Sequence, residues 1–299
     1  MAEWERTRAW VEEVSGGRVV AVDRLKGGWT SVMRQVEVDG PGGRRALVLR
    51  SFVDEFFVRH AEGLLTREAE VLRLLRGSGV PAAEVVGVDA VGRYCEHPSL
   101  VMTLLPGAVR VEDDGAPARA GLLARQLVAI HQVRVETRPR EYQAWTGAER
   151  VRLPEATTRP KVWKAAVEGI RRQAPQYEGV FLHRDFHPGN VLFDGDVITG
   201  VVDWVETSWG PADLDVAHCS TALALLHGPE YGLRFPELYS AAGGRLADWE
   251  DQRYWRLLDA LAFAPDAEKV AVPWRDLGRT DLTPSLLQTR LEAYLEAVL

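Results

Sequence analysis

A chain of 299 residues is longer than one ordinary domain and predicts two lobes. Its 46% hydrophobic and 26% charged residues are typical of a globular protein, and a net charge of −7 without a basic stripe argues against a nucleic-acid-binding protein. No apolar run approaches the ~18 residues needed to span a bilayer. The charged N-terminal segment lacks the apolar core of a signal peptide. The two cysteines have no CxxC spacing and are interpreted as reduced core residues. From these features together we expect a cytoplasmic protein with no membrane or nucleic-acid partner.

The N-terminal third alternates strand-like and turn-like segments. Hydrophobic periodicity predicts a helix over residues 3–14 and strands over 18–25, 32–38 and 45–51. The turn between the first two strands contains Gly27, Gly28, Thr30 and Ser31, and its glycines would let the backbone approach a phosphate closely. A Gly-Gly hairpin is more often only a hairpin, so this turn alone does not establish a nucleotide site.

The next segments add one long helix and two strands. Residues 52–63 have no clear period and are interpreted as a connection, whereas residues 64–76 predict a helix that Gly77 and Gly79 end. Strands are predicted near residues 84–88 and 100–105. Beyond them the pattern is mainly helical, with helices predicted over residues 119–133, 162–173, 213–227, 230–241, 248–263 and 284–298. A strand-rich first part and a helical second part indicate an α+β protein.

The polar residues with the clearest chemistry lie between these helices. Asp185 and Asn190 lie in a loop after the apolar residues 180–182, and Asp203 ends a hairpin predicted over residues 191–202. That hairpin would return Asp203 to the side of the loop. Two carboxylates and a carboxamide supply the oxygen ligands that suit Mg²⁺ shared with phosphate groups.

The sequence motifs of this region resemble those of a known family. Residues 183–190 have the spacing His-x-Asp-x-x-x-x-Asn of the protein-kinase catalytic loop. Trp204 replaces the Phe-Gly of protein kinases, and the His-Pro-Gly-Asn wording and the Gly-Pro-Ala-Asp-Leu-Asp of residues 210–215 also differ from them. Together these motifs resemble the aminoglycoside phosphotransferase and choline kinase-like family. The resemblance implies a bilobal protein-kinase-like fold, with residues 1–105 as a small β-rich N-lobe containing one main helix and residues 106–299 as a larger, mainly helical C-lobe.

The resemblance also implies an activity and a metal site. It predicts an ATP-dependent O-phosphotransferase that moves the γ-phosphate of Mg-ATP to a small-molecule hydroxyl, with Asp185 as the base. Asn190 and Asp203 would be the Mg²⁺ ligands, and Asp215 would tie a helix start to the catalytic loop. The glycine turn matches the nucleotide-covering turn of the family.

Further nucleotide-binding residues follow from the same resemblance. Arg50 occupies the strand position at which kinases present a lysine to the phosphates, and Glu68, rather than Glu70, would be its partner. A solvated helix glutamate is the alternative for Glu68. In the segment that matches the hinge between lobes, the Thr103 carbonyl and the Leu105 N–H would pair with adenine, and Met102 would lie behind it. From the residues alone this segment is a core strand entering a turn.

Several alternatives remain open at this stage. The protein could phosphorylate a peptide Ser/Thr hydroxyl, or it could be a catalytically silent nucleotide-binding module. The acceptor could be aminoglycoside-, choline- or sugar-like, with antibiotic resistance as one biological role; ATP versus GTP and monomer versus homodimer are not decided. The acidic balance is compatible with a cationic acceptor, although solubility alone explains it. A pocket for such an acceptor could be lined by Glu206, Glu250, Asp251, Asp259, Asp266 and Glu268, but charges of this kind are more often solvated helix faces.

Overall fold

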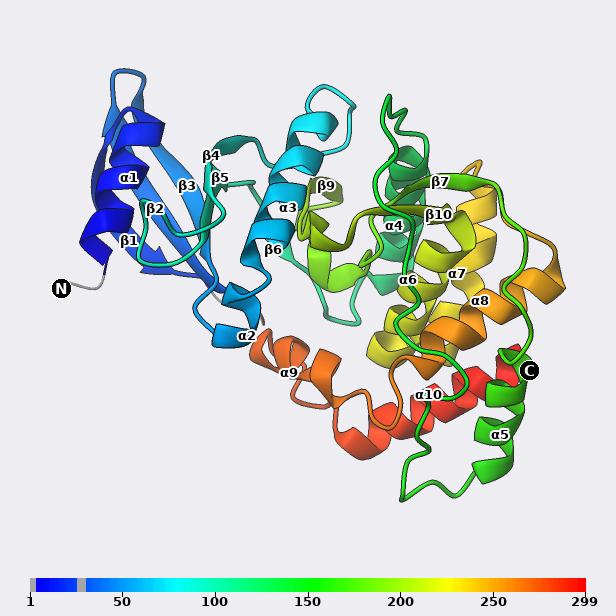
Figure 1. Ribbon diagram of the computed structural model, residues 1–299. Helices are drawn as coiled ribbons and strands as arrows, with labels where there is room; N and C mark the ends of the chain where they lie inside the picture. The colour runs from blue at the N-terminus through cyan, green and yellow to red at the C-terminus, as the bar shows by residue number, and fades with distance from the viewer. Residues whose placement is uncertain (1–3, 26–30) are drawn as a thin grey trace. The chain divides into compact units, whose positions relative to one another are not determined.

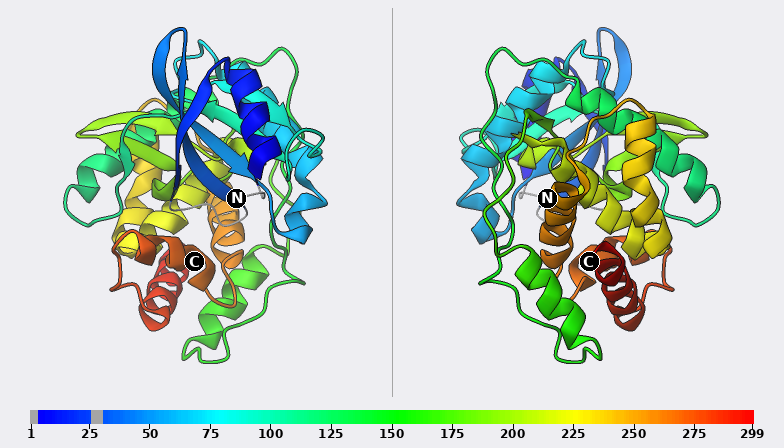
Figure 2. Two further views of the ribbon diagram at one scale, coloured as in Figure 1. Left: turned by 90° about the vertical axis from the view of Figure 1, so that its left-hand side faces the viewer. Right: turned by 90° about the vertical axis from the view of Figure 1, so that its right-hand side faces the viewer.

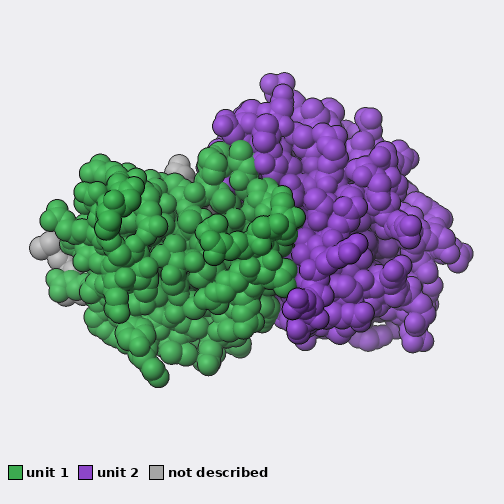
Figure 3. All heavy atoms as spheres, turned by 90° about the horizontal axis from the view of Figure 1, so that it is seen from above, with its two compact units in different colours: residues 1–107, 199–205 green, residues 108–198, 206–299 purple. Residues whose placement is uncertain are grey.

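The computed structural model describes residues 4–25 and 31–299 and has the α+β organisation expected from the sequence (Figure 1). Gly27, Gly28 and Thr30 of the predicted phosphate-covering turn lie outside the described residues. The chain divides into two compact units, coloured in Figure 3: unit 1 is Met1–Gly107 with Thr199–Val205, and unit 2 is Ala108–Ile198 with Glu206–Leu299. Among the described residues, no helix is long and apolar enough to cross a membrane.

Unit 1 is built on an antiparallel sheet of five strands in the order β1-β2-β3-β5-β4. The strands are β1 (Arg18–Arg24), β2 (Val32–Gly40), β3 (Gly43–Ser51), β4 (Val85–Asp89) and β5 (Ser99–Thr103). Each confirms a strand that periodicity predicts. The central strand β3 is buried over its second half because β2 and β5 flank it on both sides.

Side chains alternate along β3, so one face of the strand packs in the apolar core and the other face carries a polar contact. Leu47 and Leu49 join the apolar cluster that contains Trp10 and Val11 of helix α1 (Glu5–Ser15). Successive residues of a strand point to opposite faces, so Arg50 lies on the other face of the sheet. There it meets helix α3 (Ala61–Leu75), whose buried positions recur with the helical period.

The segment interpreted as a connection contains a short helix, α2 (Glu55–Val58). Asp54 caps it by accepting the backbone N–H of Phe56 at 2.9 Å. One turn of helix has no apolar period, which is why hydrophobic patterning did not reveal it.

Unit 2 is mainly helical. Its helices are α4 (Ala116–His131), α5 (Pro160–Gly169), α6 (Ala212–His227), α7 (Pro229–Ala241), α8 (Trp249–Leu261), α9 (Glu268–Asp276) and α10 (Pro284–Val298). Helix α6 is the centre of this unit, since every residue from Ala212 to Leu226 is buried. Helices α7, α8 and α10 contact it, and Figure 2 shows α10 in red beside these elements. Helix α9, which contains Pro273, was not predicted.

Short strands hold the loop that carries Asp185. β7 (Gly179–Leu182) precedes the loop and pairs antiparallel with β10 (Ser208–Pro211), a strand that the sequence did not reveal. β8 (Val191–Asp194) follows the loop and lies between β6 (Ala108–Val109) and β9 (Val197–Val201) in a three-stranded sheet, which confirms the predicted hairpin. The division between the two units runs through β9.

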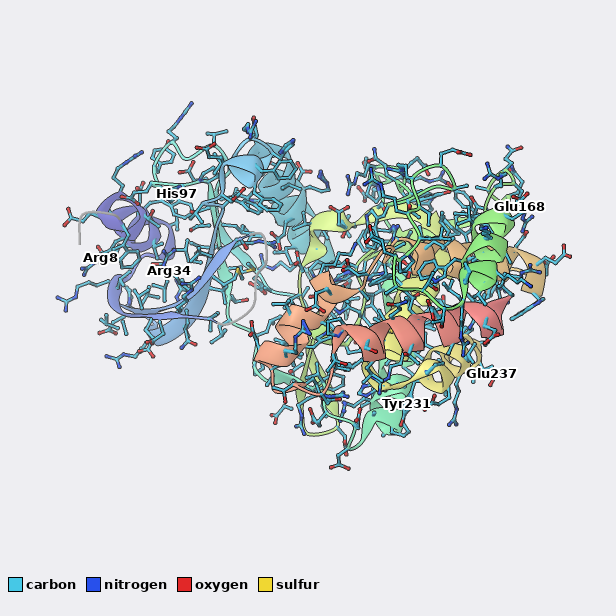
Figure 4. The ribbon with its side chains drawn as sticks, turned by 90° about the horizontal axis from the view of Figure 1, so that it is seen from below. Arg8, Arg34, His97, Glu168, Tyr231 and Glu237 are labelled. Atoms are coloured by element: carbon cyan, nitrogen blue, oxygen red, sulfur yellow. The ribbon has the colours of Figure 1, made fainter. Side chains whose placement is uncertain are left out.

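Some ion pairs of the described residues lie on the surface. Arg8 of α1 contacts Glu12 at 3.2 Å, and Glu168 of α5 contacts Arg171 at 3.1 Å; both labelled side chains, Arg8 and Glu168, reach the periphery in Figure 4. Exposed pairs of this kind contribute at most about 1 kcal/mol, so the fold depends on its cores.

Candidate active site

Unit 1 contains a buried cluster in which one cation contacts two carboxylates. Nη1 of Arg50 lies 2.9 Å from Oε1 of Glu68 and 3.0 Å from Oδ1 of Asp203. The side chains of Arg50 and Glu68 are buried, whereas that of Asp203 is 39% exposed. The structure therefore brings Arg50 and Glu68 together as the resemblance implies, and adds Asp203 to the same guanidinium.

The charge of Arg50 is fixed by this arrangement. Burial acts against a charged guanidinium, but the carboxylates of Asp203 and Glu68 outweigh burial and raise the pKa of Arg50 above its usual value. Burial raises the pKa of Glu68 because it disfavours the charged carboxylate, whereas the positive charge of Arg50 acts to lower this pKa. Glu70, the alternative partner, is exposed on the same helix.

Asp203 holds its position at the cost of backbone strain. Its φ of 65° lies in the left-handed region, which residues other than glycine rarely adopt. The next residue, Trp204, is buried and donates its indole N–H to the Val201 carbonyl at 2.9 Å. This anchor and the ion pair with Arg50 hold Asp203 in a conformation that costs on the order of 1–3 kcal/mol.

The remaining nucleotide-site candidates of unit 1 are placed as follows. Ser31 is buried directly before β2, with its hydroxyl 3.6 Å from the sulfur of Met33. Met102 is buried in β5, and Thr103 ends that strand, with its N–H donated to the Glu84 carbonyl at 2.9 Å. Leu105 is half-buried two residues beyond the strand.

In unit 2, Asp215 lies in the first turn of α6 and holds the loop that carries Asp185. Its two carboxylate oxygens accept the backbone N–H groups of His183, at 2.9 Å, and Arg184, at 2.8 Å. Arg184 has a φ of 77°, so the bond to Asp215 holds a strained loop residue. His131 lies 3.2 Å from the same carboxylate and 2.7 Å from the Tyr239 hydroxyl, so this buried histidine has two polar partners.

Asp185 has a partner on each of its two carboxylate oxygens. Nδ2 of Asn190 donates to Oδ2 at 3.0 Å and also to the Asp185 backbone carbonyl at 2.9 Å. Nε2 of His218 lies 3.1 Å from Oδ1. The side chain of Asp185 is 31% exposed, so the carboxylate is held in place and still accessible.

The surroundings of Asp185 favour its charged form. Burial alone would raise the pKa of Asp185, but the hydrogen bond from His218 and the positive charge of that ring hold the pKa well below its usual range. The ring of His187 is farther away, with Nε2 3.8 Å from Oδ1, and its Nδ1 accepts the Gly189 N–H at 3.0 Å.

The sequence analysis did not identify His218 as a partner of Asp185, and it assigned Asp259 to the lining of an acceptor pocket. Nδ1 of His218 lies 3.0 Å from Oδ1 of Asp259, which is buried on α8. The available signal was the position of His218 three residues after Asp215, on a helix that is buried from Ala212 to Leu226. A histidine buried in such a helix needs polar partners.

The family follows from a comparison of sequences. A model of the phosphotransferase enzyme family, described as APH, matches residues 22–255, which is more than three quarters of the chain. The chain belongs to this family. It is therefore a phosphotransferase that acts on hydroxyl acceptors. Comparison with curated protein sequences finds no match.

Solved structures confirm the kinase-like fold of this family member. A candidate aminoglycoside phosphotransferase from Ralstonia eutropha JMP134 is 19% identical, with a TM-score of 0.65 over 98% of this chain and 97% of that one. A thermostable mutant of aminoglycoside phosphotransferase APH(4)-Ia, in a ternary complex with ADP and hygromycin B, is 18% identical, with a TM-score of 0.64 over 97% and 98%. A candidate fructosamine-3-kinase from Thermobifida fusca is 21% identical, with a TM-score of 0.59 over 97% of each chain.

The acids proposed to line an acceptor pocket of this phosphotransferase are largely neutralised. Glu206 pairs with Arg140 at 2.6 Å, Asp251 with Arg172 at 2.9 Å, Glu268 with Arg275, and Asp259 with His218. These four carboxylates belong to ion pairs within unit 2. Cations of the protein itself therefore offset part of the negative charge of the six candidate acids.

Proposed function

We propose that this phosphotransferase moves the γ-phosphate of Mg-ATP to a hydroxyl of a small molecule, with Asp185 as the base. The observation that carries the proposal is the state of Asp185, a half-exposed carboxylate whose two oxygens are held by Asn190 and His218. Phosphoryl transfer depends mainly on positioning and charge stabilisation, and a carboxylate fixed in this way can orient an incoming hydroxyl group.

In this reaction Asp185 would accept the hydrogen bond of the acceptor hydroxyl. The hydroxyl oxygen forms a bond to the γ-phosphorus, the bond from that phosphorus to the β–γ bridging oxygen breaks, and ADP leaves. The proton of the hydroxyl passes to Asp185. A carboxylate with a lowered pKa is a weak base, so its main contribution is to orient the hydroxyl and to receive the proton late.

Asn190 and Asp203 are the proposed Mg²⁺ ligands, and their contacts fit that role. The amide nitrogen of Asn190 donates to Asp185, which leaves its carbonyl oxygen as the ligating atom. Asp203 uses Oδ1 in its contact with Arg50 and is partly exposed, so its carboxylate remains suited to a hard cation. When bound, Mg²⁺ would neutralise phosphate charge.

The nucleotide is assigned to unit 1. Arg50 supplies a permanent positive charge for the phosphates, and Glu68 holds it in position. Met102, Thr103 and Leu105 are proposed to contact the adenine, as the family resemblance implies. Ser31 and the turn before it, with Gly27, Gly28 and Thr30, are proposed to cover the phosphates.

Three observations limit the choice of acceptor and of rival functions. The APH(4)-Ia complex contains hygromycin B, and another neighbour is described as a fructosamine kinase, so both point to small hydroxylated compounds. Four of the six candidate pocket acids already belong to ion pairs, which reduces the negative charge available to a strongly cationic compound. The presence of Asp185, Asn190 and Asp203 argues against a silent nucleotide-binding module.

A panel of acceptors tests the proposal. ADP release from Mg-ATP is measured with aminoglycosides, macrolides, choline, sugars and a Ser/Thr peptide pool. We expect a small hydroxylated compound to raise ADP release, and Asp185→Asn to lower this rate by about 10²- to 10⁴-fold while Mg-ATP still binds.

Asp196→Asn is the matched control because Asp196 is an exposed carboxylate in the turn between β8 and β9. This variant should retain the rate of the unmodified protein. A rise with the peptide pool alone would favour the peptide-kinase alternative. Absence of nucleotide binding in the unmodified protein would contradict the proposed function.

A further inference from the structure

His218 lies between two carboxylates inside unit 2. Its Nε2 is 3.1 Å from Oδ1 of Asp185, and its Nδ1 is 3.0 Å from Oδ1 of Asp259. The side chains of His218 and Asp259 are 5% and 0% exposed, respectively. Asp185, His218 and Asp259 thus form a continuous row from an accessible carboxylate to a fully buried one.

The two hydrogen bonds indicate the protonation state of His218. An ionised carboxylate only accepts hydrogen bonds, and a neutral imidazole has a single N–H donor. His218 can donate to both carboxylates only as an imidazolium. Burial acts against this charge, but Asp259 and Asp185 outweigh burial and raise the pKa of His218 to about 9.

The groups around this row are consistent with a cation at its centre. The ionisable side chains that face His218 are Asp185 and His187 from the loop and Asp259 from α8. The charge of Arg184 acts on Asp259, and the aromatic rings of Trp145 and Phe263 lie 5.0 Å and 6.0 Å from the His218 ring.

We propose that His218, held by Asp259, is a positioning residue that fixes the Asp185 carboxylate for the acceptor hydroxyl. The inference rests on the proposed function, because it gives Asp185 its place in phosphoryl transfer. Asn190 fixes Oδ2 of Asp185 and His218 fixes Oδ1, so the carboxylate cannot rotate freely.

A metal site is the main competing interpretation, since ligand atoms of Asp185, His187 and His218 lie within 4.8 Å of one another. The hydrogen bonds argue against it. Nδ1 of His187 accepts the Gly189 N–H, so a neutral His187 carries its proton on Nε2, the atom that faces Asp185. That tautomer has no lone pair to offer a metal at this position.

Two substitutions of His218 separate positioning from a general structural role. In His218→Gln the side-chain amide reaches the place of Nε2 and can still donate to Asp185, whereas in His218→Asn it reaches only the place of Nδ1 and serves Asp259. We expect His218→Asn to lower kcat by up to about 100-fold with little change in the KM for ATP, and His218→Gln to recover part of that loss. Asp259→Asn should have a kcat between the values of these two variants.

His227→Gln is the matched control. His227 is also on α6, and its Nδ1 contacts Asp113 at 2.6 Å, but it belongs to neither the loop nor the Asp185 row. It should retain kcat. Rates are measured with the acceptor that gives the highest rate in the panel.

A spectroscopic measurement tests the inference without relying on the enzymatic rate. In the ¹⁵N NMR spectrum of the labelled protein at neutral pH, both ring nitrogens of His218 should have imidazolium shifts. A neutral His218 would overturn the inference, as would equal kcat for His218→Asn and the unmodified protein. Stoichiometric Zn²⁺ binding that His218→Gln abolishes would favour the metal site instead. If Asp185→Asn removes activity and His218→Asn does not, the inference fails while the proposed function stands.

Discussion

In each unit of this phosphotransferase, a buried cation holds a carboxylate that has a proposed part in the reaction, but the two cations differ. In unit 1, Arg50 contacts buried Glu68 and half-exposed Asp203. In unit 2, His218 contacts buried Asp259 and half-exposed Asp185. In both clusters the accessible carboxylate is the one with a proposed part in the reaction, and the buried carboxylate holds the cation.

The difference between Arg and His determines how each cluster responds to pH. An arginine remains charged at every pH that a folded protein experiences, so Arg50 keeps its positive charge. An imidazolium loses its proton when the pH passes its pKa, which for His218 is about 9. A permanent cation suits the phosphates of a nucleotide, whereas an imidazole suits a residue that must keep a base in a defined orientation.

The largest expected effect on stability comes from removing the buried carboxylate of unit 1. Glu68→Ala would leave the buried Arg50 guanidinium with one partner fewer, and breaking a buried ion pair costs about 3–5 kcal/mol in the free energy of unfolding. Urea unfolding measures the change. Glu70→Ala, on the same helix but exposed, should change the unfolding free energy by less than about 0.5 kcal/mol. Equal losses for the two variants would show that Glu68 is not specifically required.

The second prediction concerns the pH dependence that separates the two clusters. The pKa of His218 is raised from 6.5 to about 9, so its contribution to stability is complete below about pH 6.5 and is lost as the pH rises through about 9. The difference in unfolding free energy between the unmodified protein and His218→Gln should fall over this interval, by at most roughly 3 kcal/mol.

His227 gives a control of opposite sign on the same helix. Burial lowers the pKa of His227 despite its contact with Asp113, so its neutral form is favoured in the folded protein. The difference between the unmodified protein and His227→Gln should therefore increase as the pH rises towards about 6.5. A parallel pH dependence for both variants would contradict the assignment of an imidazolium to His218.

A smaller effect is expected at Asp213, a buried carboxylate held by backbone contacts. Burial raises the pKa of Asp213 to about 6, although the Ala247 N–H, 3.3 Å away, acts in the opposite direction. A raised pKa means that ionisation of Asp213 costs stability as the pH rises from about 3.8 to about 6. Asp213→Asn should therefore stabilise the protein by about 1–2 kcal/mol at neutral pH and by less at pH 4, measured by thermal unfolding. Equal effects at the two pH values would contradict a raised pKa.

Much of the fold was predictable because its elements have strong periodic patterns. The helix now seen as α3 and the strands β2 and β3 follow directly from their buried positions. The single-turn helix α2, the strand β10 and the Pro-containing helix α9 were missed, because short or interrupted elements carry little periodic signal.

For the candidate site, motif spacing identified the loop residues and the family resemblance supplied Asp215, but neither identified His218 and Asp259 as partners of the loop. Asp185, Asn190 and Asp203 lie in a recognisable pattern, and the pairing of Arg50 with Glu68 followed from the family resemblance. The contact between Arg50 and Asp203 joins residues that are 153 positions apart, and that between His218 and Asp259 joins residues 41 apart. Such pairs depend on tertiary packing, which no local pattern specifies.

The most direct test of the account is the chemical identity of the product. The protein is incubated with Mg-ATP and the acceptor found in the panel, and the reaction is followed by ³¹P NMR. We predict a new phosphomonoester signal on the acceptor that grows in step with ADP and does not form at a comparable rate with Asp185→Asn. Release of inorganic phosphate without a phosphorylated acceptor, or equal product formation by Asp185→Asn, would contradict the proposed role of Asp185.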